Sequence, residues 1–217
     1  VCTKKEELET LRELEDSSGI IIIVNHNRRF DPNHKCLKQL IQTGSLGRLI
    51  RGDIDYYGGW CHNGVHIVDV LQYLFNSLLS PTVIKYACDS KYPTDPTLHV
   101  EAEIVGAPIR MTGHDESFYQ ILDMNLKFEM GQIKIENFGQ EIKVFKKFVN
   151  QEGENILEPD VEQSRTGMLN PIAYAVETMV EYLETQDESI LYPFGLEQAE
   201  ITMDTLWKGK SLYENRS

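Results

Sequence analysis

The sequence predicts an α+β domain built on an open, largely antiparallel (mixed) β-sheet with helices on one face, preceded by the last helix and strand of a parallel α/β domain. A continuous apolar run at residues 20–24 is typical of a strand buried on both faces, whereas later segments alternate apolar and polar residues, as half-buried strands do. Helical spacing returns between and after these segments. We therefore expect residues 1–30 to be a remnant of one domain and residues 31–217 to form a second.

The N-terminal segment has the signals of a helix followed by a strand. Thr3 and Glu6 have the spacing of a capping box, and Gly19 is a helix stop, so a helix is expected over residues 4–18. The run at residues 20–24 then predicts the buried strand. A helix and one fully buried strand cannot form a stable sheet alone, which is why we assign them to a larger parallel domain.

The remainder of the chain predicts the open sheet and its helices. Asp31 as a cap and Pro32 in the first turn predict the start of a helix. Residues 150–166 read as a loop. Alternating, strand-like segments are expected at 48–57, 83–88, 98–104, 109–113, 122–130, 133–135 and 142–148, and further helices at 66–75, about 171–185 and about 196–211.

Composition excludes several classes of protein. A formal net charge of −13 over 217 residues argues against nucleic acid as a partner, because binding phosphates requires clustered Lys and Arg. The longest apolar run has five residues, far below the roughly 20 that cross a bilayer, so no membrane span is expected. The four cysteines are scattered without a disulfide-framework spacing, which favours reduced thiols and a cytoplasmic protein.

Cys61, His62 and His66 form the most distinctive cluster of reactive side chains. They could be a metal site, the base of an enzyme, or ordinary packing. Asn63 and the glycine after it interrupt the helix that would place both histidines on one face, so we predict no metal site. The residues alone leave two readings of His66 open: a general base, or a histidine at a helix start that is hydrogen-bonded to Asp69.

Three segments, VNHNRRFDP (24–32), LIQTGSLGRLI (40–50) and NGVHIVDVLQYLF (63–75), resemble the Gfo/Idh/MocA family of sugar oxidoreductases. The resemblance implies an N-terminal Rossmann domain with a Gly-rich turn and a Glu-Lys-Pro segment, neither of which this chain contains. We therefore interpret residues 1–30 as the end of a Rossmann domain. The Asn-Gly-x-His form is similar to members that act in cell-surface polysaccharide synthesis.

The resemblance also implies roles for individual residues. His66 stands where the family has the group that takes the proton of the substrate hydroxyl. Arg28 matches an arginine that approaches substrate and cofactor, and Asn27 beside it is a further cofactor candidate; Arg29 is expected to be a structural ion-pair partner. His62 occupies a position where the family usually has a carboxylate or amide, which leaves substrate contact to His62 or to Asn63.

Tyr174, on the helix near residue 171, is a candidate for contact with a sugar hydroxyl, with core packing as the alternative.

The function implied is that of the C-terminal domain of an NAD- or NADP-dependent oxidoreductase, which transfers a hydride at a secondary alcohol or ketone of a sugar or nucleotide sugar. The alternative is a non-catalytic scaffold that binds carbohydrate or mediates oligomerisation. We place Leu, Met and Phe positions on the uncovered sheet face, and large exposed apolar patches mark interfaces. Together with the family's habit of associating through this face, this predicts a homodimer or homotetramer.

Overall fold

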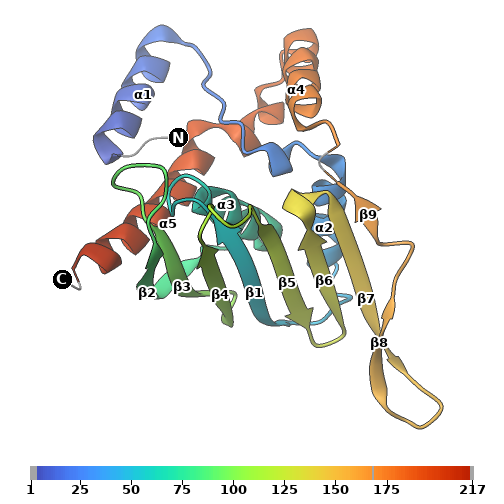
Figure 1. Cartoon of the computed structure of the whole chain (residues 1–217). Helices are drawn as coiled ribbons and strands as arrows, with labels where there is room; N and C mark the ends of the chain where they lie inside the picture. The colour runs from blue at the N-terminus through green and yellow to red at the C-terminus, as the bar shows by residue number, and fades with distance from the viewer. Residues whose placement is uncertain (1–3, 168, 216–217) are drawn as a thin grey trace.

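The computed structural model describes residues 4–167 and 169–215 and shows one sheet with three helices packed against one face (Figure 1). Two more helices stand at one end of the sheet. The α-helices are α1 (Lys5–Ser18), α2 (Pro32–Gln42), α3 (Gly64–Phe75), α4 (Pro171–Thr185) and α5 (Leu196–Glu214); short 3-10 turns are η1 (Asn27–Arg29), η2 (Asn137–Gly139), η3 (Glu188–Ile190) and η4 (Tyr192–Phe194). No helix in this part of the chain combines the length and the apolar character that spanning a membrane requires.

The sheet has the mixed, largely antiparallel order that the alternation predicts. Along its path the strands run β2-β3-β4-β1-β5-β6-β7-β8, and β9 pairs with β7. The pairing of β1 with β4 is parallel, and the other strand pairs are antiparallel. The strands are β1 (Leu49–Tyr57), β2 (Ser80–Cys88), β3 (Thr97–Ile104), β4 (Ala107–His114), β5 (Leu122–Phe128), β6 (Gly131–Glu136), β7 (Glu141–Val149), β8 (Asn155–Pro159) and β9 (Arg165–Thr166).

The core lies between the sheet and the helices α2, α3 and α5. The helix α3 is apolar on most sides, and its residues Ile67, Val68 and Leu71 are fully buried. The sheet contributes every second strand residue to this core, for example Met124 and Leu126 of β5. Because α3 is held on all sides, the residues of its first turn have a fixed position above the end of β1.

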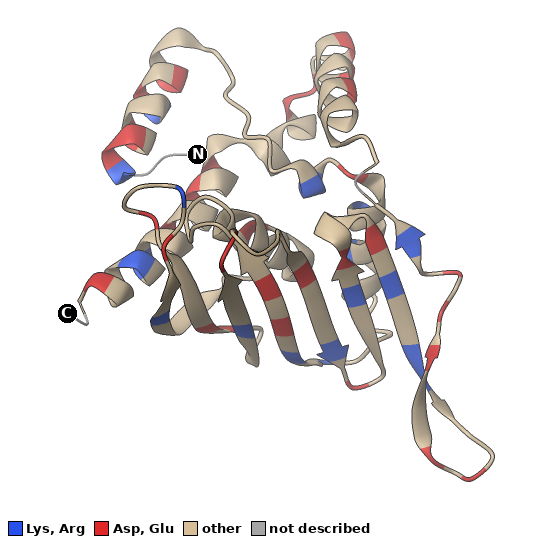
Figure 2. Cartoon of the chain, in the orientation of Figure 1, with Lys and Arg blue, Asp and Glu red and all other residues tan. Residues whose placement is uncertain are grey.

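Charged residues recur along the strands of the sheet (Figure 2), and the burial pattern places them on the uncovered face, which corrects the expectation of an apolar face. The apolar residues of β5, such as Met124, are buried under the helices, because period-two alternation places the whole apolar set on the helix side. On the open side Asp53 is paired with Arg51 and with Lys127, the latter at 3.2 Å. The argument from apolar area is therefore wrong, and oligomerisation stays a prediction.

Two other segments differ from expectation. Residues 20–24 form no strand: Ile23 makes an isolated bridge with Gly195, and Ile20 is 64% exposed. A strand buried on both faces needs neighbouring strands, and none in the described chain runs beside this segment. Residues 150–166, expected as a loop, instead include β8 and β9, which pair with opposite ends of β7.

The N-terminal helix is confirmed, although its cap is not the expected one. Thr3 lies outside the described residues. The helix α1 begins after Lys4, whose backbone N–H donates to the Glu7 carboxylate at 3.2 Å. Gly19 ends the helix in the left-handed conformation, as predicted. The start of α2 is confirmed as well, because the Asp31 carboxylate accepts the His34 N–H at 2.9 Å.

Candidate active site

His66 lies in the first turn of α3, directly after the chain has turned back from β1. The turn is made by Gly58 and Gly59, both at positive φ (63° and 90°). A side chain at Gly59 would collide with the Asp95 carboxylate, 2.4 Å from its Cβ position, so only glycine fits there. The His66 N–H donates to the Asn63 carbonyl at 3.1 Å, which fixes the residue at the start of the helix.

The environment of His66 favours the neutral imidazole. The side chain is partly buried, and burial together with the smaller effect of the positive charge of Arg28 lowers the pKa of His66 to about 4. Asp69 acts in the opposite direction with a smaller effect. At neutral pH the ring is therefore uncharged and has a free lone pair, which is the form that can accept a proton.

Arg28, on η1, is buried beside this site. Its Nη2 donates to the Phe138 carbonyl at 2.9 Å, while its Nε has no partner in the described chain. Burial lowers the pKa of Arg28 to about 10, so the guanidinium remains charged at neutral pH. The neighbouring Asn27 also has a buried side-chain oxygen without a partner. The two candidate residues thus carry one unused donor and one unused acceptor.

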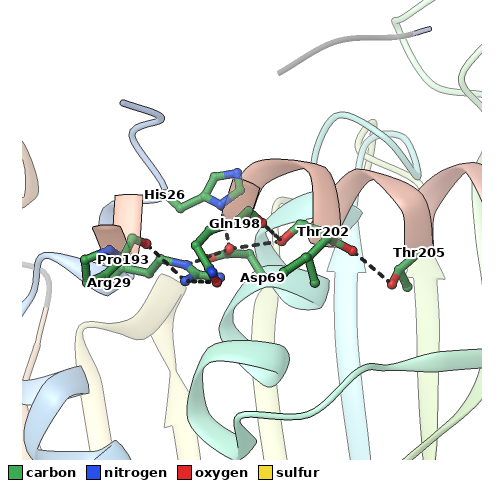
Figure 3. Close-up of polar contacts among 8 residues, drawn as sticks. His26, Arg29, Asp69, Pro193, Gln198, Thr202 and Thr205 are labelled. Atoms are coloured by element: carbon green, nitrogen blue, oxygen red, sulfur yellow. Dashed lines mark hydrogen bonds and ion pairs between the residues drawn. The ribbon is translucent and has the colours of Figure 1, made fainter. Parts of the chain in front are cut away.

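Asp69, one turn after His66 on α3, is bound elsewhere (Figure 3). Its Oδ1 lies 2.5 Å from His26 Nδ1 and 2.9 Å from Arg29 Nε, and it accepts the Thr202 hydroxyl at 3.3 Å. Burial opposes ionisation, but His26 and Arg29 together hold the pKa of Asp69 below its usual value. The Asp69 cluster joins η1, α3 and α5, so the reading of His66 as a partner of Asp69 is wrong, and the expectation that Arg29 is a structural ion-pair partner is confirmed.

His62 and Asn63 belong to the turn before α3, which hydrogen bonds to Asp95 and to Gly58 hold in place. The Asp95 carboxylate accepts the N–H groups of Cys61 and His62 at 2.8 and 2.9 Å. The exposed His62 ring stacks on Tyr92 with centroids 3.5 Å apart. The Asn63 amide donates to the Gly58 carbonyl at 2.9 Å. The two histidines therefore differ in burial: His62 is exposed, whereas His66 is partly buried.

Tyr174 lies in a separate packing cluster. It contacts a small core formed by Phe30, Ala175 and Phe194, in which the rings of Phe30 and Phe194 stack at 3.8 Å. The structure thus shows packing at Tyr174, and its contact with a sugar stays a prediction. Across the described residues, no three His, Cys, Asp or Glu side chains converge in a way that could hold a metal ion.

Sequence reasoning missed three partnerships around this site: His26 with Asp69, Asp95 with the turn before α3, and the fully buried pair Asp31 and His34, whose Nδ1 and Oδ2 are 2.6 Å apart. The signal for the first was available. An aspartate inside an apolar helix needs a buried partner, and residues 24–32 contain two donors that could serve, His26 and Arg29. Nothing local in the sequence pointed to Asp95.

No family model and no curated protein sequence matches the chain. Solved structures do. A super-repressor mutant of Gal80p from Saccharomyces cerevisiae is 16% identical and aligns over 98% of this chain and 68% of its own, with a TM-score of 0.72. An NAD binding oxidoreductase from Klebsiella pneumoniae is 12% identical, over 98% and 69%, with a TM-score of 0.71.

The enzyme UDP-N-acetylglucosamine 3-dehydrogenase GnnA from Acidithiobacillus ferrooxidans is 9% identical, over 97% of this chain and 67% of its own, with a TM-score of 0.64. At such identities the likeness establishes the fold and not the activity. The chain therefore has an α+β fold found in oxidoreductases of greater length.

Proposed function

We propose that this chain is the substrate-binding part of a nicotinamide-dependent oxidoreductase that acts at a secondary alcohol or ketone of a sugar or nucleotide sugar, as in the polysaccharide branch of the resembling family. Residues 31–217 would form the substrate domain and residues 1–30 the end of a Rossmann domain. The observation that carries the proposal is the neutral, partly buried His66 next to the fixed charge of Arg28, in a fold that NAD-binding oxidoreductases share.

His66 accepts the proton of the substrate hydroxyl in the oxidation direction. An uncharged imidazole is required for this step, and burial with Arg28 nearby keeps His66 uncharged. Arg28 stabilises the negative charge that develops on the carbinol oxygen as the proton leaves. In the reduction direction His66 returns the proton and Arg28 polarises the carbonyl.

The unused polar atoms of η1 fit a nicotinamide. Its carboxamide has one acceptor and two donor hydrogens, and Asn27 Oδ1 and Arg28 Nε are a buried acceptor and a buried donor without partners. When bound, the cofactor, NAD or NADP, would supply the hydride chemistry. Asn27 and Arg28 would hold its nicotinamide end, and the dinucleotide would need a binding site beyond these two residues.

A second candidate, a non-catalytic scaffold that binds carbohydrate or mediates oligomerisation, is favoured by one observation. His62 stands where the resembling family usually has a carboxylate or amide, and its ring stacks on Tyr92. A repressor, Gal80p, also has this fold. Both candidate functions include assembly into a homodimer or homotetramer, and light scattering measures the molar mass that decides this.

The two candidates differ in the effect of His66→Ala on the full-length protein. For the enzyme, His66→Ala lowers kcat by roughly 10² to 10⁴ with the cofactor affinity unchanged, followed by the absorbance of reduced cofactor over a panel of sugars. His62→Ala, the matched control, raises KM and leaves kcat within about threefold, and chelators have no effect. Normal turnover in His66→Ala refutes the base assignment, and absence of turnover in the wild type favours the scaffold.

A further inference from the structure

A groove lies beside the turn that precedes α3, between the loop that joins β2 to β3 and the last turns of α5. Figure 1 shows these two segments next to each other. This groove has a volume of about 570 Å³, within the range of small-molecule sites. The aromatic side chains that line it are Tyr86, Tyr92 and Tyr213, together with Trp60, which is only 1% exposed. Trp60 is fixed, because its indole N–H donates to the Leu206 carbonyl at 2.9 Å.

The β2–β3 wall of the groove is rigid before any ligand arrives. The Ser90 hydroxyl donates to the Asp95 carbonyl at 2.7 Å and accepts the Tyr92 N–H at 3.0 Å. The Asp95 N–H in turn donates to the Tyr92 carbonyl at 3.2 Å. Because these bonds hold Tyr92 in place, a ligand would not have to order the loop, which is a cost that otherwise reduces affinity.

The groove adjoins the turn that leads into α3 and His66. Tyr92 lines the groove and stacks on His62, which stands four residues before His66 in the turn that leads into α3. Asp95 joins the two sites as well, since it lines the groove and its carboxylate holds the turn before α3. A substrate larger than one sugar ring, with its reacting carbon at His66, would extend over His62 into the groove.

The chemistry of the lining selects a saccharide. Pyranose rings present an apolar C–H face, which stacks on aromatic side chains, and a rim of hydroxyl donors, which carboxylates accept. The exposed carboxylates Asp89 and Glu214 line the groove, and Lys210 is the cation among its described lining residues. Lys91 Nζ lies 5.1 Å from the centre of the Tyr92 ring. An excess of carboxylates repels phosphate groups, so a nucleoside diphosphate is disfavoured.

We propose that the groove lined by Tyr86, Tyr92 and Tyr213 binds an uncharged sugar unit of the substrate, one position beyond the unit oxidised at His66. This inference rests on the proposed function, because the sugar unit in the groove is placed relative to the unit that reacts at His66. It also narrows that function, because it favours an oligosaccharide or glycoside over a nucleotide sugar.

Binding to the 217-residue chain tests the groove without turnover. The probes are cellobiose, maltose, lactose and diacetylchitobiose, with UDP-glucose as the anionic comparison, followed by ligand-detected NMR and by Trp fluorescence. At least one disaccharide binds, more tightly than UDP-glucose. Tyr92→Ala and Tyr213→Ala each weaken this binding about tenfold, the equivalent of one lost ring contact. Tyr213→Phe, which keeps the ring, retains the binding within about threefold.

The matched control is Tyr119→Ala, a tyrosine that is 59% exposed and lies outside the groove. It leaves saccharide affinity unchanged, and urea unfolding shows whether the Tyr92 and Tyr213 variants are folded. Absence of binding by all four disaccharides, tighter binding of UDP-glucose, or equal loss in the control overturns the inference. The groove and the proposed function fail separately: saccharide binding that survives His66→Ala, together with unchanged turnover in that variant, leaves the groove intact and removes the catalytic role of His66.

Discussion

Removal of the Asp69 carboxylate is expected to strand a buried positive charge. Arg29 is 5% exposed, and its Nε lies 2.9 Å from Asp69 Oδ1. Deleting one partner of a buried ion pair typically costs about 3–5 kcal/mol. Arg29 would keep two bonds from Nη1, to the Pro193 carbonyl at 3.1 Å and to Gln198 Oε1 at 3.4 Å, so the lower end applies. We expect Asp69→Ala to reduce the free energy of unfolding by about 3 kcal/mol.

The source of this cost can be isolated with a double variant. Asp69→Leu combined with Arg29→Met replaces the pair by apolar side chains of similar volume, a change that is often close to neutral. His26 then loses its partner, which leaves a penalty of about 1–2 kcal/mol. The double variant should therefore be more stable than Asp69→Ala, although it carries one more substitution.

Urea unfolding at neutral pH, followed by circular dichroism, measures these differences as shifts in the midpoint. The control is Glu129→Ala, which removes the partner of Arg48 at the surface, where the Arg48 side chain is 87% exposed. An exposed pair contributes under about 1 kcal/mol. If Asp69→Ala costs no more than Glu129→Ala, Asp69 does not stabilise the junction of η1, α3 and α5. If the double variant is no better than the single, the stranded charge of Arg29 is not the cause.

The strands were predictable because alternation is a local property. In β5 the order Leu122, Asp123, Met124, Asn125 identifies both faces without knowledge of any other strand. The run at residues 20–24 carries a different kind of information. Its β-branched residues favour an extended chain, but a ladder forms only with a partner strand, and here the segment makes one bridge, at Ile23.

The candidate site likewise contains some features that a short stretch of sequence predicts and others that only the folded chain brings together. His66 and Asn63 became candidates through the resemblance of residues 63–75 to a family motif, which a short stretch of sequence carries. The bonds of Asp69 to His26 and of Asp95 to the turn before α3 join segments that only the folded sheet brings together. The uncovered face was misassigned for a related reason. Alternation separates two faces, and the arrangement of the helices decides which of them is buried.

Two further changes test the packing at β1 and the protonation state at the site. Gly52→Ala places a Cβ 2.7 Å from Ile109 and 3.1 Å from Leu126, so overpacking should lower the free energy of unfolding by about 1–3 kcal/mol in urea, and an unchanged midpoint contradicts the packing described for β1. His66 has a pKa of 6.5 when unfolded and about 4 when folded, so between these values the unfolded chain binds the extra proton. This contribution is fully present above pH 6.5 and is lost as the pH falls towards 4, by about 1.4 kcal/mol per pH unit at most. His66→Gln does not titrate there, and its stability relative to the wild type should therefore rise by about 3 kcal/mol between pH 7 and pH 4. Urea midpoints of the two proteins across this range give the difference directly, because the other ionisable groups are common to both. Parallel curves would mean that His66 is not held neutral by its surroundings, and the assignment of His66 as a preformed base would fail with them.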